Sequence, residues 1–367
     1  MAKLYIEALS LDYGKTFGYQ EYLLNILKYI KLNRSKLRHE QIILLCKSQD
    51  ISVFKIFEPE ISIKNFNTSN KYHKYIIINT LNRHVNIDRQ DVILFTNNYS
   101  ALTKFCKYIL VIHDLLYLRK EYIPNRSFRW QRRIFIPRSI KLADRIVAIS
   151  QFVHNDIIES FRIKEPNKIH TIYNYFNFRK FDTTSEPDFQ KDDLEFKYFL
   201  GVSSNAFHKN SATIIKAFAQ FSEIDKEYHL VMVGHLNNSL KNIYQSLPVY
   251  QQQRIHFRSN LSNIDLGNLY KHASAYISAT LFEGLGMPII EAMYHDLPII
   301  VSDIPVCREV TQNLGIYFNP LFPEELFFCM KKVVDNNVKA SSKKIIQSTF
   351  STENTVQKYI ELINQLH

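Results

Sequence analysis

Two glutamates and two glycines in residues 281–293, LFEGLGMPIIEAM, form the stretch of this chain with the densest chemical content. Glu283 and Glu291 are separated by seven residues, and Gly284 and Gly286 lie between them. The chain has only eight glycines among 367 residues, so two of them in one loop indicate a local requirement. A residue without a Cβ lets backbone amides approach a ligand closely, and the pattern therefore predicts a binding loop.

The residues around this loop predict its position between a strand and a helix. AYISAT, residues 275–280, is typical of a buried strand, and Pro288 suits the first position of a helix. A helix N-terminus presents free N–H groups and partial positive charge, which suit a phosphate. Glu283 and Glu291 would then flank a phosphate-sized anion site, with carboxylates that can accept hydrogen bonds from sugar hydroxyls. We predict that the loop admits a diphosphate between a ribose and a hexose; a tight turn with one capping glutamate is the alternative.

The elements that position this loop follow a regular alternation. Buried-strand patterns in the first half are KLYIEAL, QIILLCK, DVILFTN, YILVIHD and RIVAIS, and those in the second half are FLGVSS, YHLVMVG, RIHFRS, AYISAT and PIIVSD. Amphipathic helical patterns such as GYQEYLLNILKYIKL separate many of them. This alternation predicts an α/β fold with two Rossmann-like domains, each a parallel sheet covered by helices. Ligands of such sheets bind at the carboxyl ends of the strands, so we expect the chemistry in the loops that follow them.

A polar, acidic stretch divides the chain. FDTTSEPDFQKDDLE, residues 181–195, interrupts the alternation of strands and helices. We therefore predict an N-terminal domain over residues 1–178, a linker over 179–195 and a C-terminal domain over 196–347.

The composition bounds the class of protein. No apolar run reaches the roughly 18 residues that a membrane span needs. Glu7 and Asp12 interrupt the N-terminus before the apolar core of a signal peptide can form, so we expect a cytoplasmic protein. The four cysteines are scattered singly, without the spacing of a zinc cluster, and no metal site is predicted.

The net charge of +11 predicts an anionic partner. The basic residues are densest in 119–145, RKEYIPNRSFRWQRRIFIPRSIKLADR, where only Glu121 and Asp144 oppose them. Part of the stretch has a helical pattern, with Ile134, Phe135, Ile140 and Leu142 expected to face inward. Trp130, the only tryptophan, favours contact with an anionic membrane at this surface, and a solvated basic face is the alternative. No recognition motif accompanies the charge, so nucleic-acid binding is not predicted.

Residues 280–310, TLFEGLGMPIIEAMYHDLPIIVSDIPVCREV, resemble the donor-site signature of retaining GT-B glycosyltransferases of the "glycosyl transferases group 1" type. That signature is a glutamate, seven residues and a second glutamate, with a glycine-rich loop between them. The downstream DLPIIVSD is similar to the family's G-x-P-V-V-x-S-D, with Asp296 where glycine is usual. The segments GVSSNAFHKNSATIIKAF, VIHDLLYLRKEYIP, ADRIVAISQFVHNDI and FSTENTVQKYIELI resemble further family segments. The resemblance implies two Rossmann-like domains facing across a cleft, with a terminal helix, 348–367, packing back on the N-terminal domain.

The resemblance implies roles for residues of the C-terminal domain. Glu291 would bind the nucleotide ribose, Glu283 would contact the donor hexose, and Lys209 would neutralise the diphosphate as it leaves. The backbone of the loop residues would contact the sugar and the diphosphate; these residues are Gly284, Leu285, Gly286 and Met287.

In the N-terminal domain, the resemblance places His113 beside the transferred sugar, with Asp114 orienting its loop toward the acceptor. Gly18 falls after the first strand, where the family brings backbone close to the donor phosphate or the acceptor. One departure concerns the charge: the family usually has an arginine a few residues before the lysine, and SSNAFHKN has none. Lys209 would then carry more of the diphosphate's charge, or another arginine would supply it.

The resulting hypothesis is a retaining, metal-independent hexosyltransferase that uses a nucleotide-diphospho-sugar as its donor and no cofactor. The segments ADRIVAISQF and HD most resemble mannosyl- and rhamnosyl-type transferases of bacterial surface-polysaccharide and O-antigen assembly. GDP-mannose is therefore the first donor to test, with UDP- and dTDP-sugars as alternatives, and the expected acceptor is a lipid-linked saccharide at the inner face of the membrane.

Two other classes of protein fit the sequence less well than a glycosyltransferase. A dinucleotide-dependent oxidoreductase needs GxGxxG after a strand, and the window that starts at Gly284 fails because its sixth position is Ile289. A P-loop is absent from the sequence as well. A non-catalytic protein that binds a sugar or a nucleotide stays open, because the arginine is missing.

Overall fold

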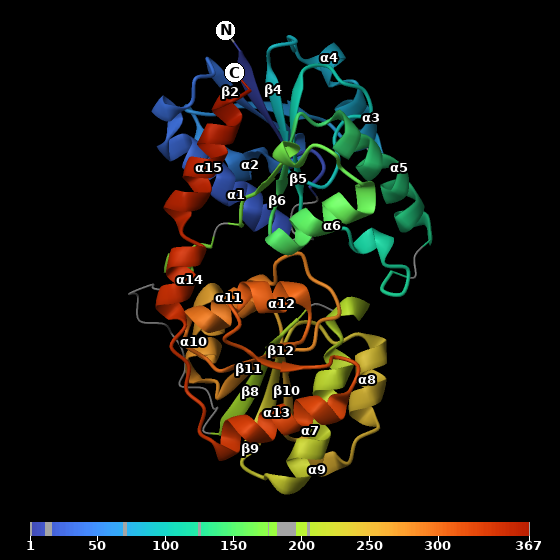
Figure 1. Ribbon diagram of the computed structural model, residues 1–367, viewed down its shortest axis with the longest axis vertical. Coiled ribbons are helices and arrows are strands. Elements are labelled where there is room, and N and C mark those ends of the chain that lie inside the picture. The colour runs from blue at the N-terminus through green and yellow to red at the C-terminus, as the bar shows by residue number, and fades with distance from the viewer. Residues whose placement is uncertain are drawn as a thin grey trace. The chain divides into compact units, whose positions relative to one another are not determined.

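The chain forms two compact units, each built on its own parallel sheet (Figure 1). The computed structural model describes residues 2–11, 17–68, 72–123, 126–174, 176–181, 196–203 and 206–366. The first unit is Met1–Tyr175 together with Phe350–His367, and the second is Phe176–Thr349. Of the predicted linker, residues 182–195 lie outside the described residues.

The sheet of the first unit has seven parallel strands in the order β3-β2-β1-β4-β5-β6-β7. The strands are β1 (Lys3–Glu7), β2 (Gln41–Lys47), β3 (Ser62–Phe66), β4 (Val92–Phe95), β5 (Lys107–Ile112), β6 (Arg145–Ala148) and β7 (Ile169–Thr171). The helices are α1 (Phe17–Leu32), α2 (Ile51–Phe54), α3 (His73–Asn79), α4 (Leu81–His84), α5 (Arg126–Leu142), α6 (Gln151–Phe161) and α15 (Thr352–Asn364). Central strands such as β4, VILF, are buried on both faces, which accounts for their continuous apolar runs.

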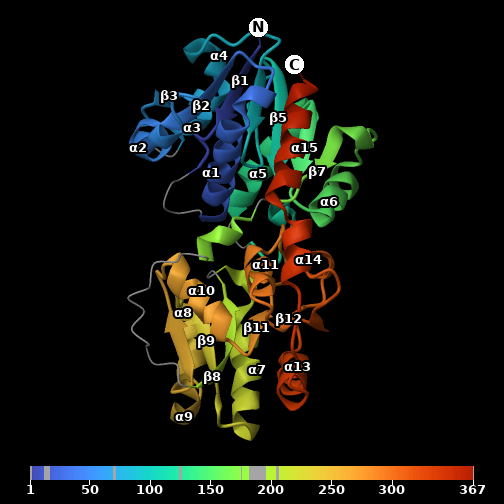
Figure 2. The ribbon, with the colours of Figure 1, turned by 90° about the vertical axis from the view of Figure 1, so that its left-hand side faces the viewer.

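The terminal helix α15 packs on the first unit, as predicted. Figure 2 shows α15, in red, alongside β7, the edge strand of this sheet. Lys107 at the start of β5 donates to the Leu366 carbonyl oxygen at 2.7 Å, and Asn364 donates to the Lys36 carbonyl oxygen at 2.9 Å. The hydroxyl groups of Tyr22 in α1 and Tyr359 in α15 form a buried hydrogen bond.

The sheet of the second unit has six parallel strands in the order β10-β9-β8-β11-β12-β13. The strands are β8 (Lys197–Val202), β9 (Tyr228–Val233), β10 (Ile255–Arg258), β11 (Ala275–Ser278), β12 (Ile299–Ser302) and β13 (Ile316–Phe318). The helices are α7 (Ser211–Ile224), α8 (Asn238–Gln245), α9 (Val249–Gln252), α10 (Asn263–His272), α11 (Met287–Tyr294), α12 (Pro305–Val310), α13 (Pro323–Asp335) and α14 (Lys343–Thr349). The two parallel sheets confirm the predicted pair of Rossmann-like domains.

Each sheet has a point where the chain reverses the order in which it adds strands. In the first unit this switch point lies between β1 and β4, and in the second it lies between β8 and β11. The loops at the carboxyl ends of such neighbouring strands diverge to opposite faces of the sheet and leave room for a ligand. We therefore expect ligands to bind at the loops after β1, β4, β8 and β11.

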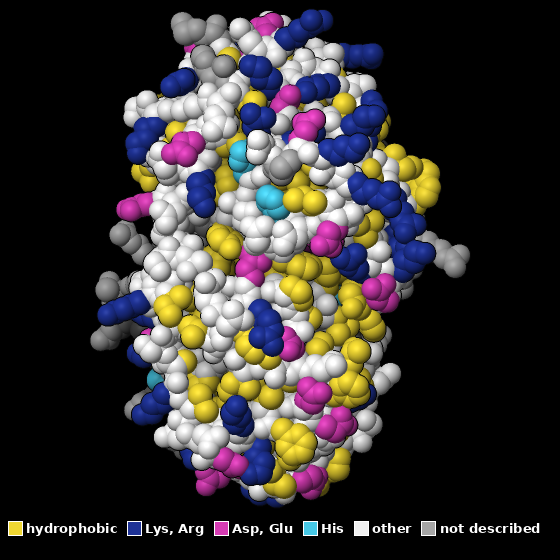
Figure 3. Space-filling view, viewed as in Figure 1, with side chains coloured by type: hydrophobic (Ala, Val, Ile, Leu, Met, Phe, Trp, Pro, Cys, Tyr) yellow, Lys and Arg dark blue, Asp and Glu magenta, His cyan; other side chains and the backbone are white. Residues whose placement is uncertain are grey.

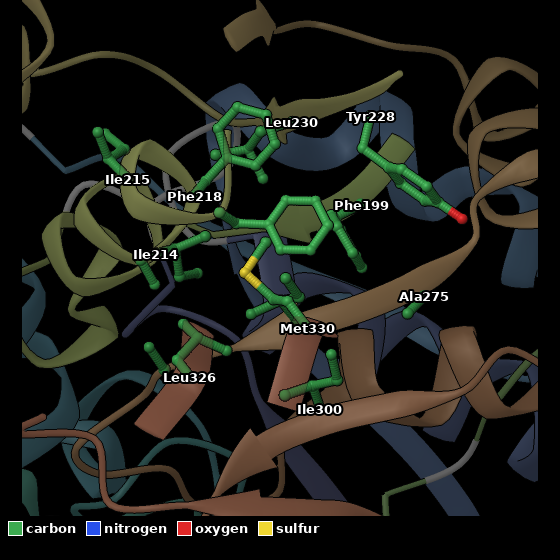
Figure 4. Close-up of a cluster of buried hydrophobic side chains, with 14 of the residues drawn as sticks. Phe199, Ile214, Ile215, Phe218, Tyr228, Leu230, Ala275, Ile300, Leu326 and Met330 are labelled. Atoms are coloured by element: carbon green, nitrogen blue, oxygen red, sulfur yellow. The ribbon is translucent and has the colours of Figure 1, made fainter. Parts of the chain in front are cut away.

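A buried apolar cluster holds the second sheet to its helices (Figure 4). Figure 4 shows side chains from the strands, from α7 and from α13 pointing toward one another, among them Phe199, Phe218, Ile300 and Met330. Burial of these apolar side chains stabilises the sheet and the helices packed on it. The site loops begin at the ends of the strands that this cluster holds together.

Asp296 accounts for one departure from the family pattern. Its backbone lies in the left-handed region, with φ +55°, where glycine has no steric cost and aspartate is tolerated better than most residues. Its carboxylate accepts hydrogen bonds from the Ser342 and Lys343 N–H groups at 2.7 and 2.8 Å, at the start of α14. Aspartate is thus less favoured than glycine in this backbone conformation, but its carboxylate caps the N-terminus of α14.

Replacing Asp296 by alanine should lower the free energy of unfolding by about 2 kcal/mol, since the cap and the tolerance for positive φ are both lost. Asp296→Gly should lose about half as much, because glycine keeps the backbone unstrained. Asp296→Asn should lose least. Urea denaturation of the three variants checks this ranking, and equal losses for alanine and glycine would contradict it.

Candidate active site

The loop between β11 and α11 requires a glycine at its end. Gly286 has φ +84° and immediately precedes α11, in which Pro288 is the second residue, one position later than predicted but still in the first turn. A Cβ at this position would lie 3.1 Å from the Ile289 side chain. Of the other predicted loop residues, Leu285 is buried, whereas Gly284 and Met287 are partly exposed. The loop therefore has the tight entry into a helix N-terminus that the sequence predicts.

Lys209 and Glu283 meet in an ion pair at the switch point of the second sheet. Lys209 ends the short helical turn Phe207–Lys209 that follows β8, and its Nζ donates to Oε1 of Glu283 in the loop after β11. The two side chains are only 21% and 14% exposed. Two residues that are 74 positions apart in the sequence, and that were predicted separately, are thus brought together.

Glu291 is 6% exposed and forms a second anchored carboxylate in the same unit. Its Oε2 accepts a hydrogen bond from the Tyr270 hydroxyl in α10 at 2.8 Å. Burial, with the nearby Glu291 carboxylate, raises the pKa of Tyr270 well above its usual value, so the hydroxyl stays a donor. Tyr270 is a residue that the sequence analysis missed, because a tyrosine within an ordinary amphipathic helix carries no motif.

A small cavity joins the ion pair to the start of α11. Its volume is about 10 Å³, enough for roughly one water molecule. Its lining includes Lys209, Glu283, Gly286, Ser203 and Ser278. The side chains predicted to bind the sugar and the diphosphate therefore face one shared space.

His113 follows β5 in the first unit and is tightly held. Its backbone N–H donates to Asn98 Oδ1 at 2.6 Å, and its Nε2 lies 2.8 Å from the Thr96 carbonyl oxygen. Because a carbonyl oxygen accepts, Nε2 carries the hydrogen, and Nδ1 carries the lone pair. The rings of Tyr19 and Tyr22 contact the imidazole edge to face, with centroids 4.4 and 4.7 Å away.

Burial lowers the pKa of His113 to about 4, an effect partly offset by the hydrogen bond to the Thr96 carbonyl group. The imidazole is therefore neutral at physiological pH. Its fixed tautomer and its position at the carboxyl end of a strand fit a residue that binds a polar ligand group.

Two further predicted residues of the first unit differ in their surroundings: Asp114 makes hydrogen bonds in the turn after His113, and Gly18 has open space where a Cβ would lie. Asp114 accepts hydrogen bonds from the Leu116 N–H at 3.0 Å and from the Tyr19 hydroxyl at 3.2 Å. Gly18 is the second residue of α1, and a Cβ there would meet nothing within 4 Å. Packing therefore gives no reason for glycine at this position, and its role near a ligand stays a prediction.

A buried charged cluster at the carboxyl ends of β1 and β2 was also missed. Glu7 is fully buried and accepts hydrogen bonds from the Ser10 N–H at 2.6 Å and the Ser10 hydroxyl at 2.9 Å. Lys74 donates to the Ser10 carbonyl oxygen, and Lys47 donates to that of Leu11. These bonds fix the loop at the switch point of the first sheet. The signal in the sequence was Glu7, a charged residue directly after the apolar residues LYI of a buried strand.

The basic stretch forms α5, with one error in the predicted inward face. Of the predicted residues, Ile140 is buried and Phe135 and Leu142 are partly buried, but Ile134 is 45% exposed. Ile136, which was not predicted, is buried instead. Ile134 is about half a turn from Ile136, so the inward stripe runs through the latter residue. Trp130 is 68% exposed, and Figure 3 shows Lys and Arg side chains gathered over α5.

Metal-binding clusters and membrane-spanning helices are two further features that could indicate function. The described part of the chain contains no group of three or more His, Cys, Asp and Glu side chains placed to bind a metal ion. Within the described ranges, no helix combines the length and the apolar character that a membrane crossing requires.

Two parallel Rossmann-like sheets with the terminal helix returning to the first unit define the GT-B class of fold. The whole chain aligns with 98% of a glycosyltransferase from Rickettsia africae at a TM-score of 0.69 and 18% identity. It also aligns over its full length, and that of the solved chain, with Anabaena Alr3699/HepE in complex with UDP-glucose, at a TM-score of 0.74 and 15% identity. At these identities the comparisons establish the fold.

Sequence comparison then gives the family. The model described as "Glycosyl transferases group 1" matches residues 182–348, and that described as "Glycosyltransferase Family 4" matches residues 35–179. The two models match adjacent parts of the chain, one mostly in the first unit and one in the second, and the chain belongs to the family 4, group 1 glycosyltransferases.

The curated relatives include two mannosyltransferases. The chain is 30% identical to the O-antigen chain mannosyltransferase RfbU of Salmonella typhimurium, over 58% of this chain and 56% of the relative. It is 28% identical to the serotype-specific mannosyltransferase WbdA of Escherichia coli, over 59% of this chain and 28% of the relative. The chain thus matches little more than half the length of RfbU and less than a third of that of WbdA.

Proposed function

We propose that this chain is a retaining glycosyltransferase that transfers a hexose from a nucleotide-diphospho-sugar, and that mannose from GDP-mannose is the first donor to test. The observation that carries the proposal is the meeting of Lys209 and Glu283 beside the N-terminus of α11, with Glu291 anchored in the same helix. The names of the curated relatives support mannose and an acceptor saccharide of the O-antigen type.

The proposed reaction begins with the donor's diphosphate at the helix N-terminus. Glu291 accepts hydrogen bonds from the ribose, and Glu283 accepts them from the hexose. As the bond from the anomeric carbon to the phosphate oxygen breaks, negative charge grows on the diphosphate, and Lys209 and the N–H groups of α11 stabilise it. The acceptor hydroxyl attacks from the same face, and its proton passes to the departing diphosphate, so the anomeric configuration is kept.

A panel of GDP-, UDP- and dTDP-sugars tests this proposal. We expect GDP-mannose to raise the melting temperature and to release GDP slowly in the presence of water or an acceptor. A stronger response to a UDP- or dTDP-sugar would change the donor but keep the class. Binding without turnover on any acceptor would favour a non-catalytic homologue, and binding of no nucleotide would overturn the proposal.

We further propose that α5 contacts anionic lipid at the cytoplasmic face of the membrane, where a lipid-linked acceptor would be presented. Trp130 and Ile134 are exposed on α5, and Ile76 is exposed on α3. The two helices are neighbours, because the rings of Tyr75 in α3 and Phe135 in α5 have centroids 5.7 Å apart. Apolar and aromatic side chains among many cations fit the interface of an anionic bilayer.

Reversing Arg133 and Lys141 to glutamate should abolish co-sedimentation with anionic liposomes, because each basic residue contributes about 1 kcal/mol near such a surface. Both side chains are exposed on α5. The matched control reverses Lys241 and Lys271, exposed lysines of the second unit, and should leave sedimentation unchanged. If the wild-type protein ignores anionic liposomes even at low salt, α5 is a solvated basic face.

A further inference from the structure

The backbones that carry Lys209 and Glu283 are fixed to each other. His208, the residue before Lys209, accepts hydrogen bonds at its carbonyl oxygen from the Leu281 N–H at 2.6 Å and from the Thr280 hydroxyl at 3.2 Å. Leu281 lies two residues before Glu283. The ion pair therefore joins two side chains whose separation is set by the main chain, and it does not depend on the chance meeting of flexible loops.

The surroundings of the ion pair strengthen it. Both side chains are mostly withdrawn from water, and attraction between opposite charges grows as the local dielectric falls. Breaking the pair leaves a largely buried carboxylate without its cation, which is costly unless other donors replace the ammonium group. Whatever takes Lys209 away from Glu283 must therefore overcome this cost or compensate for it.

The two halves of a nucleotide-sugar compete for opposite members of this pair. A diphosphate attracts the Lys209 ammonium group, and hexose hydroxyls can donate to the Glu283 carboxylate. We infer that the Lys209–Glu283 ion pair acts as an internal competitor for the diphosphate, so that the site favours the sugar-loaded donor over the spent nucleotide. This inference rests on the proposed function of the same site.

The competition has a direction in the catalytic cycle. An intact donor brings hydroxyls that compensate Glu283 when Lys209 turns to the diphosphate, so the two parts of the donor bind with positive coupling. Once the hexose has moved to the acceptor, Glu283 loses those donors and attracts Lys209 again. The ion pair then re-forms at the expense of the contact between Lys209 and the diphosphate, which promotes release of the spent nucleotide.

Calorimetric titration with GDP and with inorganic pyrophosphate tests the inference. Glu283→Gln removes the competing charge while keeping the side-chain shape, and it should tighten binding of both probes by about tenfold, the size expected for a partly desolvated charge pair. The same variant should lower the turnover of GDP-mannose, because the carboxylate that binds the hexose is gone. Glu227→Gln is the matched control, since it breaks the exposed Lys197–Glu227 ion pair of the same unit and should change neither value.

A double-mutant cycle separates competition from a general effect of charge. In a Lys209→Ala background, Glu283→Gln should give little further gain, because the cation for which the carboxylate competes is absent. Unchanged or weaker GDP affinity in Glu283→Gln would overturn the inference, as would an equal gain in both backgrounds. Glu283→Ala provides a second variant if the glutamine form does not fold. If the wild-type protein binds none of GDP, UDP or dTDP, the proposed function fails, and the inference fails with it.

Discussion

Replacing Lys209 by alanine is expected to lower kcat by about 10²–10³-fold, the usual cost of removing one group that stabilises developing charge. Negative charge on the diphosphate grows as the glycosidic bond breaks, so the ammonium group interacts more strongly with the transition state than with the bound donor. KM should therefore change less than kcat. Steady-state kinetics with the donor identified in the nucleotide-sugar panel measure both quantities.

The control for this variant is Lys216→Ala, which removes an exposed lysine of α7 in the same unit and should leave both constants unchanged. A Lys209→Ala enzyme with a higher KM and normal kcat would contradict the expected role, because Lys209 would then bind the ground-state phosphate only. The missing family arginine sharpens the expectation. Among the described residues of the second unit, Arg308 is held by Asp303 through two hydrogen bonds of 2.6 and 2.8 Å, and Arg254 donates to backbone carbonyl groups, whereas the Lys209 ammonium group lies at this loop beside Glu283.

The fold was predictable because its signals are local. Strands buried on both faces need continuous apolar runs, and crossover helices need a period of 3.6, so the alternation of these two patterns specifies parallel sheets. The same local logic located the glycine loop between β11 and α11, since positive φ at Gly286 and a proline in the first helical turn are short-range requirements. Asp296 shows the limit of such logic, because its value to α14 depends on residues 46 and 47 positions away.

The parts that were missed depend on long-range side-chain contacts. The Tyr270 hydroxyl bonds to Glu291 from another helix, and Lys209 meets Glu283 across two strand ends. No periodicity encodes such contacts, because they arise only when the sheet brings distant loops together. The error at Ile134 has a different origin, since an apolar residue on a basic helix can face solvent or lipid as readily as the core.

Glu291→Ala is expected to weaken GDP binding by about ten- to a hundredfold, because the loss of hydrogen bonds to a charged acceptor costs roughly 1.5–3 kcal/mol. Glu291 is 6% exposed, and its carboxylate is oriented by the Tyr270 hydroxyl. In the alanine variant, a water molecule is therefore a poor substitute for the missing carboxylate. Bare nucleotide and nucleotide-sugar should weaken alike, since both carry the ribose. Titration calorimetry with GDP and GDP-mannose measures the two effects side by side.

The Tyr270–Glu291 contact supplies the variants that separate binding from folding. Glu291→Ala leaves the buried Tyr270 hydroxyl without this acceptor, which should also lower the free energy of unfolding by about 1–3 kcal/mol. Glu291→Gln keeps an acceptor for that hydroxyl and removes only the charge, so it should fold more stably than the alanine variant and still bind GDP weakly. Tyr270→Phe keeps the Glu291 carboxylate but removes the hydrogen bond that orients it. We expect this variant to lose less affinity for GDP than Glu291→Ala does. Normal GDP affinity in both Glu291 variants would remove this carboxylate from the donor site and leave it a structural partner of Tyr270.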